Sequence, residues 1–220
     1  MKELKAVIFD LDGTLIDSVD AHMASWTEAL KKVGIKDDRG EVKRLVGMSA
    51  RDISKALIPE GREEKRGELR LLKRRLYYEE FFPSRVVPFP DAVETLKQIN
   101  DKGLKCAIAS SIDSKKIRMI AQKFGFDRYI QAIVGADEVE RGKPNPEIML
   151  EASSKLGVIP ESCIVVGDTA YDVAAGRAAG MITMAVVRET TVMEALIAQK
   201  PDWIVMNLSE LMDVLRTVMP

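Results

Sequence analysis

Two carboxylate side chains, those of Asp10 and Asp12, directly follow an apolar run near the start of the chain. The run covers residues 6–9, and an unbroken run of this kind is typical of a strand that is buried on both faces of a parallel sheet. Ligands of open α/β sheets bind at the carboxyl ends of such strands. Carboxylates in that place can attack an electrophile, transfer protons or bind a metal ion. The alternative is a simple turn, which Asp and Gly also favour.

Other polar residues end later apolar runs. Ser110 and Asp168 each follow such a run, as Asp10 does, and Lys143 lies in the segment GKPNP. A single polar residue after a strand usually marks only the start of a loop. Because parallel strands place their carboxyl ends at one edge of the sheet, we expect these four side chains to converge on one crevice.

The elements that must position these residues follow two patterns. Residues 19–82 show apolar residues at helical spacing and no strand pattern, which indicates a helical insertion. Pro83, Pro88 and Pro90 mark its end. From there to the C-terminus, apolar runs alternate with helical periodicities. This alternation predicts an α/β fold with a doubly wound parallel sheet.

Composition limits the classes of function. The 220 residues carry a formal net charge of −1, so we expect no nucleic-acid partner and no membrane partner. Cys106 and Cys163 lie in predicted buried strands and show no metal-type spacing. No uncharged apolar run approaches the roughly 18 residues that span a bilayer. We therefore expect a cytoplasmic protein that is a monomer or a small homo-oligomer.

The segment FDLDGTLIDS, residues 9–18, resembles the first motif of the haloacid dehalogenase superfamily, a group of phosphotransferases. Ser110, the GKPNP segment and the run GDTAYD at 167–172 resemble its three later motifs, in the same order. The resemblance implies a Rossmann-like core domain at 1–16 and 88–220. It also implies that residues 17–87 form a small α-helical cap domain inserted into that core.

The resemblance assigns chemical roles to the strand-end residues. Asp10 matches the nucleophile that carries an aspartyl-phosphate intermediate, and Asp12 matches the general acid and base. Ser110, with Ser111 beside it, matches the hydroxyl group that holds a phosphoryl oxygen. Lys143 matches the cation that offsets negative charge on the nucleophile and the phosphoryl group.

The same resemblance implies a Mg²⁺ cofactor. Asp168 matches the residue that binds the ion together with the Asp10 carboxylate and the backbone carbonyl of Asp12, and such hard oxygen ligands suit Mg²⁺. Asp172 lies one helical turn after Asp168. It is a candidate for ordering metal-bound water or pairing with Lys143, and the alternative is an acidic residue favoured by the start of a helix.

Two residues of the insertion are candidates for contacting the substrate. Arg51 lies in a loop at 47–52 that resembles the substrate-specificity loop of the cap, and an exposed arginine near a helix start is the alternative. His22, the only histidine, borders an apolar helical stripe and faces either the interior of the cap or the cleft. The implied mechanism is complete without it.

The motifs also separate this chain from neighbours in the superfamily. The dehalogenases and the phosphonatases lack an acid two residues after the nucleophile, whereas Asp12 is present here. The β-phosphoglucomutases are closer, because Ser18, His22 and Trp26 resemble their first cap helix in spacing. Their fourth motif, however, carries two adjacent acidic residues, and Gly167 stands at the first of these positions.

We therefore predict a Mg²⁺-dependent phosphatase of a small phosphorylated metabolite, such as phosphoglycolate or a sugar phosphate. A phosphosugar mutase of the β-phosphoglucomutase type is the alternative within enzymes. A non-catalytic regulator that binds a phosphorylated ligand is the alternative outside them, since a fold alone does not fix a function.

Overall fold

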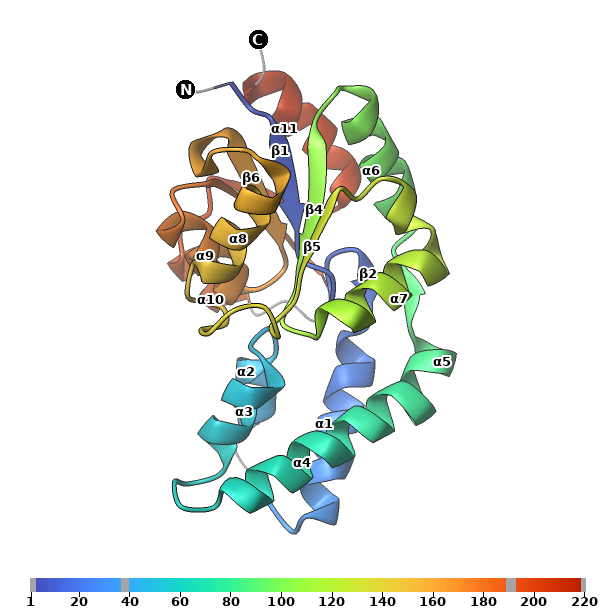
Figure 1. Cartoon of the computed structure of the whole chain (residues 1–220), viewed down its shortest axis with the longest axis vertical. Helices are drawn as coiled ribbons and strands as arrows, with labels where there is room; N and C mark the ends of the chain where they lie inside the picture. The colour runs from blue at the N-terminus through green and yellow to red at the C-terminus, as the bar shows by residue number, and fades with distance from the viewer. Residues whose placement is uncertain (1–2, 37–39, 189–192, 219–220) are drawn as a thin grey trace.

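The computed structural model describes residues 3–36, 40–188 and 193–218. Its centre is a six-stranded sheet in which every neighbouring pair of strands is parallel, in the order β5-β4-β1-β6-β7-β8 (Figure 1). The strands are β1 (Ala6–Phe9), β4 (Lys105–Ala109), β5 (Ala132–Val134), β6 (Cys163–Gly167), β7 (Ile182–Val186) and β8 (Trp203–Val205). The predicted doubly wound parallel sheet is confirmed.

Helices cover both faces of this sheet. One face packs against α6 (Ala92–Asp101), α7 (Ser114–Phe124) and α11 (Leu211–Val218), and the other against α8 (Glu147–Leu156) and α9 (Ala170–Ala178), with α10 (Met193–Ala198) beside α9. Strand β1 explains why the run at 6–9 is apolar throughout. Val7 and Phe9 enter one core cluster, Ala6 and Ile8 enter the other, and all four are fully buried.

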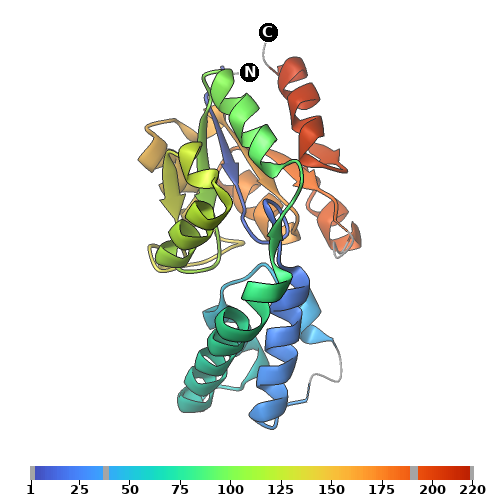
Figure 2. The same ribbon diagram turned by 90° about the vertical axis from the view of Figure 1, so that its right-hand side faces the viewer.

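The helical insertion stands beyond the carboxyl edge of the sheet (Figure 2). It contains α1 (Val19–Lys32), α2 (Glu41–Leu45), α3 (Ala50–Leu57), α4 (Glu63–Arg75), a π-helical turn (Leu76–Phe81) and α5 (Phe82–Arg85). Trp26 and Leu30, from the helical stripe expected in α1, pack with Leu69 and Leu76 in an apolar cluster separate from the two sheet clusters. The insertion therefore has its own small core.

Two short strands join the insertion to the sheet. β2 (Ile16–Asp17) pairs antiparallel with β3 (Val87–Pro88), so the chain leaves and returns at the same place. The expected boundaries between core and cap fall in this pair of strands, although the division into two domains stays a prediction. Among the described helices, none is long and apolar enough to cross a membrane.

Candidate active site

A buried lysine joins the first and the fourth sequence motif at the carboxyl edge of the sheet. Asp10 follows β1, and Lys143 reaches it from the loop before α8. The Lys143 Nζ atom donates hydrogen bonds to Asp10 Oδ1 at 2.5 Å, to Asp172 Oδ1 at 2.7 Å and to the carbonyl of Ala109 at 2.8 Å. The lysine is 1% exposed, so the three donors of its ammonium group are all satisfied without water.

Asp168, which follows β6, lies against the loop that follows β1. Its Oδ1 atom accepts a hydrogen bond from Thr14 Oγ1 at 3.0 Å. Gly13 has a φ of 81°, and a Cβ atom on it would lie 2.2 Å from Asp168 Oδ2. Only glycine permits both this backbone conformation and this approach. Arg188 holds the same loop by donating to the carbonyls of Gly13 and Thr14.

Asp10, Asp168 and Asp172 form a cluster of three buried carboxylates. Each offers one oxygen, and these oxygens lie within 4.8 Å of one another. Burial raises the pKa of Asp10 to about 7, against the opposing attraction of Lys143. Burial and the nearby carboxylates also raise the pKa of Asp168 well above its ordinary value. Three carboxylates beside one ammonium group leave negative charge uncompensated, so the donor set fits a hard divalent cation.

Asp172 has two structural roles at once. Besides accepting from Lys143, it forms a capping box at the start of α9, in which Thr169 and Asp172 exchange side-chain and backbone hydrogen bonds. The two interpretations drawn from the sequence, a partner for Lys143 and a helix-start acid, therefore both describe this residue.

Asp12 is held by different partners at the edge of the cluster. Its Oδ1 atom lies 2.7 Å from the Ser18 hydroxyl and 2.9 Å from His22 Nε2. Burial alone would raise the pKa of Asp12, but the contacts with His22 and Ser18 outweigh it and lower the pKa to about 2. In this arrangement Asp12 is an ionised carboxylate, which can accept a proton.

His22 connects Asp12 to a buried lysine of the insertion. Its Nδ1 atom lies 2.7 Å from Lys73 Nζ, and its ring stacks on Tyr77 with the ring centres 3.9 Å apart. Burial and the charge of Lys73 lower the pKa of His22, and burial lowers the pKa of Lys73 to about 8. A neutral His22 accepts from Lys73 at Nδ1 and donates to Asp12 from Nε2, which fixes its tautomer.

The serines and the arginine predicted to touch a ligand lie at the contact between the insertion and the sheet. Ser110 is buried at the end of β4, and its hydroxyl is 3.5 Å from the amide of Ile112. Ser111 donates to the carbonyl of Gly47 at 2.7 Å. Arg51 donates to the carbonyl of Glu140 at 2.6 Å. The loop expected at 47–52 is a loop only as far as Ser49, because α3 begins at Ala50. Ser111 and Arg51 thus hold this loop and the start of α3 against the core while bordering the cavity.

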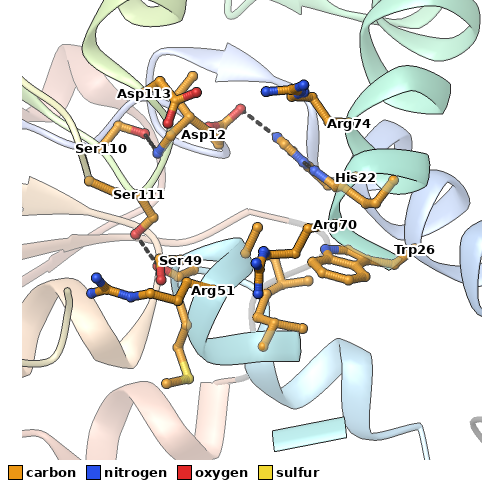
Figure 3. Close-up of a pocket in the computed structure, with 18 of the residues that line it drawn as sticks. Asp12, His22, Trp26, Ser49, Arg51, Arg70, Arg74, Ser110, Ser111 and Asp113 are labelled. Atoms are coloured by element: carbon orange, nitrogen blue, oxygen red, sulfur yellow. Dashed lines mark hydrogen bonds and ion pairs between the residues drawn. The ribbon is translucent and has the colours of Figure 1, made fainter. Parts of the chain in front are cut away.

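A cavity of about 510 Å³ opens between the insertion and the sheet edge. Figure 3 shows Ser110, Ser111 and Asp113 on one side and His22, Trp26, Arg70 and Arg74 on the other. Asp10 and Asp12 lie in its lining, so a ligand there can reach both carboxylates. Six of the sequence-predicted residues line this cavity, namely Asp10, Asp12, His22, Arg51, Ser110 and Ser111. Lys143, Asp168 and Asp172 are outside the lining and join the site through their cluster with Asp10.

Three residues with evident roles in this geometry were not predicted from the sequence. Thr14 and Arg188 fix the loop next to Asp168, and Lys73 contacts His22 from a helix 51 residues away. Thr14 lies in the first motif directly after Gly13, so its position in that motif could have indicated a role at the site. Lys73 is one of many cations in α4, and nothing in the sequence distinguishes it.

The profile of the family "haloacid dehalogenase-like hydrolase" matches residues 7–186. The chain belongs to this family. It is similar to a pyrophosphatase PpaX from Halalkalibacterium halodurans, with 33% identity over 96% of this chain and 97% of the relative. It is 26% identical to a phosphoglycolate phosphatase from Salmonella choleraesuis, over 98% of this chain and 94% of the other.

A solved structure of a Bacteroides vulgatus protein assigned as a β-phosphoglucomutase is also similar. It superposes with a TM-score of 0.85 at 27% identity, over 98% of this chain and 89% of the other. Membership of the haloacid dehalogenase-like hydrolases agrees with the resemblance seen in the four motifs. The prediction of an enzyme of the phosphatase group is confirmed at this level of detail.

Proposed function

We propose that this haloacid dehalogenase-like hydrolase is a Mg²⁺-dependent phosphatase that acts on a small phosphorylated metabolite through a phosphorylated Asp10. The single observation that carries this proposal is the contact of Lys143 with both Asp10 and Asp172, next to Asp168, where Asp10 itself lines the cavity. A nucleophilic carboxylate needs cationic neighbours before it can approach a phosphate dianion. The buried lysine supplies one of them.

In the proposed reaction, an oxygen of Asp10 attacks phosphorus and the bond to the leaving oxygen breaks. Asp12 gives a proton to that oxygen, and it later takes one from the water that hydrolyses the aspartyl phosphate. Ser18 and His22 keep Asp12 ionised in the ligand-free arrangement. An incoming phosphoryl dianion raises the pKa of a neighbouring carboxyl group, which favours the protonated form that the first step requires.

Asp10, Asp168 and the backbone carbonyl of Asp12 are the proposed ligands of Mg²⁺, with Asp172 behind them. When bound, the ion offsets charge on the phosphoryl oxygens. Lys143 shares this task and also keeps Asp10 in one orientation, because its other two hydrogen bonds anchor it to Asp172 and Ala109. Ser110 is the proposed hydroxyl donor to a phosphoryl oxygen.

The test is release of inorganic phosphate from phosphoglycolate, pyrophosphate and a panel of sugar phosphates, with and without Mg²⁺. The relatives support the first two substrates through their names. Asp10→Asn should abolish release, and Asp20→Asn, the same change at an exposed position in α1, should leave it intact. Beryllium trifluoride with Mg²⁺ should inhibit by mimicking the phosphorylated aspartate. Phosphate release by Asp10→Asn at the normal rate would exclude the covalent route.

A mutase is the second candidate, because the chain superposes well on the Bacteroides vulgatus protein. Both enzymes would form the same phosphorylated Asp10 and would differ in the group that accepts the phosphoryl group next. The discriminating experiment supplies β-glucose 1-phosphate with a trace of the 1,6-bisphosphate. A phosphatase releases phosphate steadily without the bisphosphate, whereas faster accumulation of glucose 6-phosphate would establish the mutase.

A further inference from the structure

The wall of the cavity formed by the helical insertion is cationic. Among the described residues that line it, this wall contributes four cationic side chains and no carboxylate, namely Arg51, Arg70, Lys73 and Arg74. The opposite wall contributes four carboxylates, those of Asp10, Asp12, Asp113 and Asp137, and Asp10 is the one that contacts Lys143 and belongs to the proposed Mg²⁺ site. A transferred phosphoryl group belongs at the acidic wall, so the cationic wall must face another part of the ligand.

Two of these cations lack a charged partner. Lys73 contacts His22, and Arg51 lies 3.6 Å from Asp52 while it donates to Glu140. Within the described part of the chain, no carboxylate oxygen lies within 4.0 Å of Arg70 or Arg74. Arg70 has one neutral contact, a hydrogen bond of 3.2 Å to the Ser54 hydroxyl, which directs its guanidinium group.

Arg70 and Arg74 are four residues apart on α4, so they lie on one face of the helix, where like charges repel each other. Figure 3 shows both on the side of the pocket where His22 and Trp26 lie. They flank Lys73, which reaches Asp12 through His22. A group that leaves from the phosphorus beside Asp12 therefore extends toward these two arginines.

The space between Asp12 and the two arginines is partly apolar. Trp26, Ile53 and Leu71 line it, and Leu71 is 59% exposed although it is a large apolar residue. The cavity of about 510 Å³ is in the range that drug-sized ligands occupy. A glycolate or phosphate leaving group has only a few heavy atoms and would leave most of this space and the apolar side chains uncovered.

We propose that the preferred substrate is a phosphomonoester whose leaving group has an apolar body and ends in a second anionic group, which Arg70 and Arg74 bind. This inference rests on the proposed phosphatase function and narrows its substrate class. The apolar body covers Trp26 and Leu71, and the terminal anion neutralises the two arginines. Guanidinium groups suit carboxylate and phosphate alike, because both offer paired oxygens.

A matched pair of substrates tests the terminal anion. 4-Carboxybenzyl phosphate and 4-carbamoylbenzyl phosphate have the same shape and the same type of leaving oxygen, and they differ in one negative charge. We expect kcat/KM to be about tenfold or more higher for the carboxylate, since a hydrogen bond to a charged group is worth roughly that factor or more. Phosphoglycolate has the anion without the apolar body. Its kcat/KM should therefore be lower than that of 4-carboxybenzyl phosphate.

Variants of α4 test whether Arg70 and Arg74 cause the preference for the carboxylate substrate. The double variant Arg70→Gln with Arg74→Gln should bring the two kcat/KM values to within about twofold, mainly by lowering the value for the carboxylate substrate. Arg75→Gln removes the same charge from the same helix outside the cavity lining, and it should keep the preference. The anion site would be excluded if the wild type had equal kcat/KM values for the carboxylate and the amide substrate. It would also be excluded if the double variant still preferred the carboxylate. A higher kcat/KM for phosphoglycolate would overturn the apolar body.

A binding measurement separates this inference from the proposed function. 4-Carboxybenzylphosphonate and its carboxamide have no ester bond and cannot be hydrolysed. Calorimetric titration in the presence of Mg²⁺ should give tighter binding of the carboxylate, and the double variant should lose the difference. If no phosphomonoester is hydrolysed, the proposed function fails, and the phosphonate pair still decides whether Arg70 and Arg74 bind an anion.

Discussion

Gly167 leaves the space that Asp172 occupies. A Cβ atom on Gly167 would lie 2.4 Å from Asp172 Cβ and 2.5 Å from its carboxyl carbon, distances that real atoms do not reach. Gly167 is the last residue of β6 and is buried. The buried contact between Lys143 and Asp172 therefore depends on the absence of a side chain at position 167. An acidic residue there, as in the mutases, requires a different arrangement around Lys143.

Gly167→Asp should lower both stability and activity. The added side chain overfills a packed site, which typically costs about 1–3 kcal/mol, and it displaces the partner of Lys143. We expect a lower urea midpoint and a loss of turnover on the order of 100-fold, which corresponds to about 2.7 kcal/mol. The double variant Gly167→Asp with Asp172→Gly should recover the urea midpoint in part. A single variant as stable as the wild type would contradict the steric account.

Asp10→Asn should abolish turnover, by on the order of 10⁴-fold or more, and stabilise the metal-free protein. Because burial raises the folded-state pKa of Asp10 from 3.8 to about 7, its stabilising contribution is present below pH 3.8 and is lost as the pH rises through 7. Asparagine is neutral throughout. The melting temperature of metal-free Asp10→Asn should therefore exceed that of the wild type increasingly between pH 4 and 8.

Calorimetric melting of both proteins at several pH values checks this prediction, and saturating Mg²⁺ provides the control. The ion favours ionised carboxylates, so at pH 8 it should reduce the difference in melting temperature between Asp10→Asn and the wild type. A constant difference across the pH range would contradict a raised pKa of Asp10.

Mg²⁺ binding should tighten as the pH rises. The raised pKa values of Asp10 and Asp168 mean that protons compete with the ion near neutrality. We expect the apparent Kd to fall between pH 6 and pH 8, by at most about tenfold per pH unit for each proton released. Titration calorimetry in two buffers of different ionisation enthalpy measures both the affinity and the number of protons. Asp10→Asn should release fewer protons than the wild type, and equal release would exclude Asp10 as the competing site.

His22 should titrate below its ordinary pKa of 6.5, and Lys73→Met should raise its pKa. Burial and the charge of Lys73 both disfavour the imidazolium form, so removal of that charge shifts the equilibrium toward it. As the sequence has one histidine, ring nitrogen NMR shifts of untagged protein report this residue alone. Lys65→Met, in the first turn of the same helix and outside the cavity lining, is the control. An unchanged pKa in Lys73→Met would show that the 2.7 Å contact does not govern His22.

The sequence was sufficient to predict the sheet and the convergence of the strand-end residues. Apolar runs at β1, β4 and β6 are continuous because both faces of each strand are buried. Since the strands are parallel, the polar residue after each run lies at the same edge of the sheet. The short pair of β2 and β3 was not predicted, because two residues cannot show a period.

Contacts between residues that are far apart in the sequence could not be predicted, for a different reason. His22 and Lys73 meet because α1 and α4 pack side by side, and helix packing depends on the whole apolar cluster rather than on either residue. The hydrogen bond from Arg51 to the Glu140 carbonyl joins residues 89 positions apart. A backbone acceptor carries no sequence signature, so the pattern around Arg51 could indicate only a loop near a ligand.

The pairing of β2 with β3 brings the two ends of the insertion together, so the insertion can be treated as one exchangeable segment, called the cassette below. Ile16 lies opposite Pro88 and Asp17 opposite Val87, so both ends of the cassette are adjacent and exchange needs only two cuts at one place. The groups nearest the proposed phosphoryl position, Asp10, Lys143 and Asp168, all remain with the sheet. Exchange of the insertion would therefore replace one wall of the cavity while the sheet residues that we propose for the chemistry stay in place. One condition limits such exchange, because a new insertion must supply its own partners for Asp12 in place of Ser18 and His22.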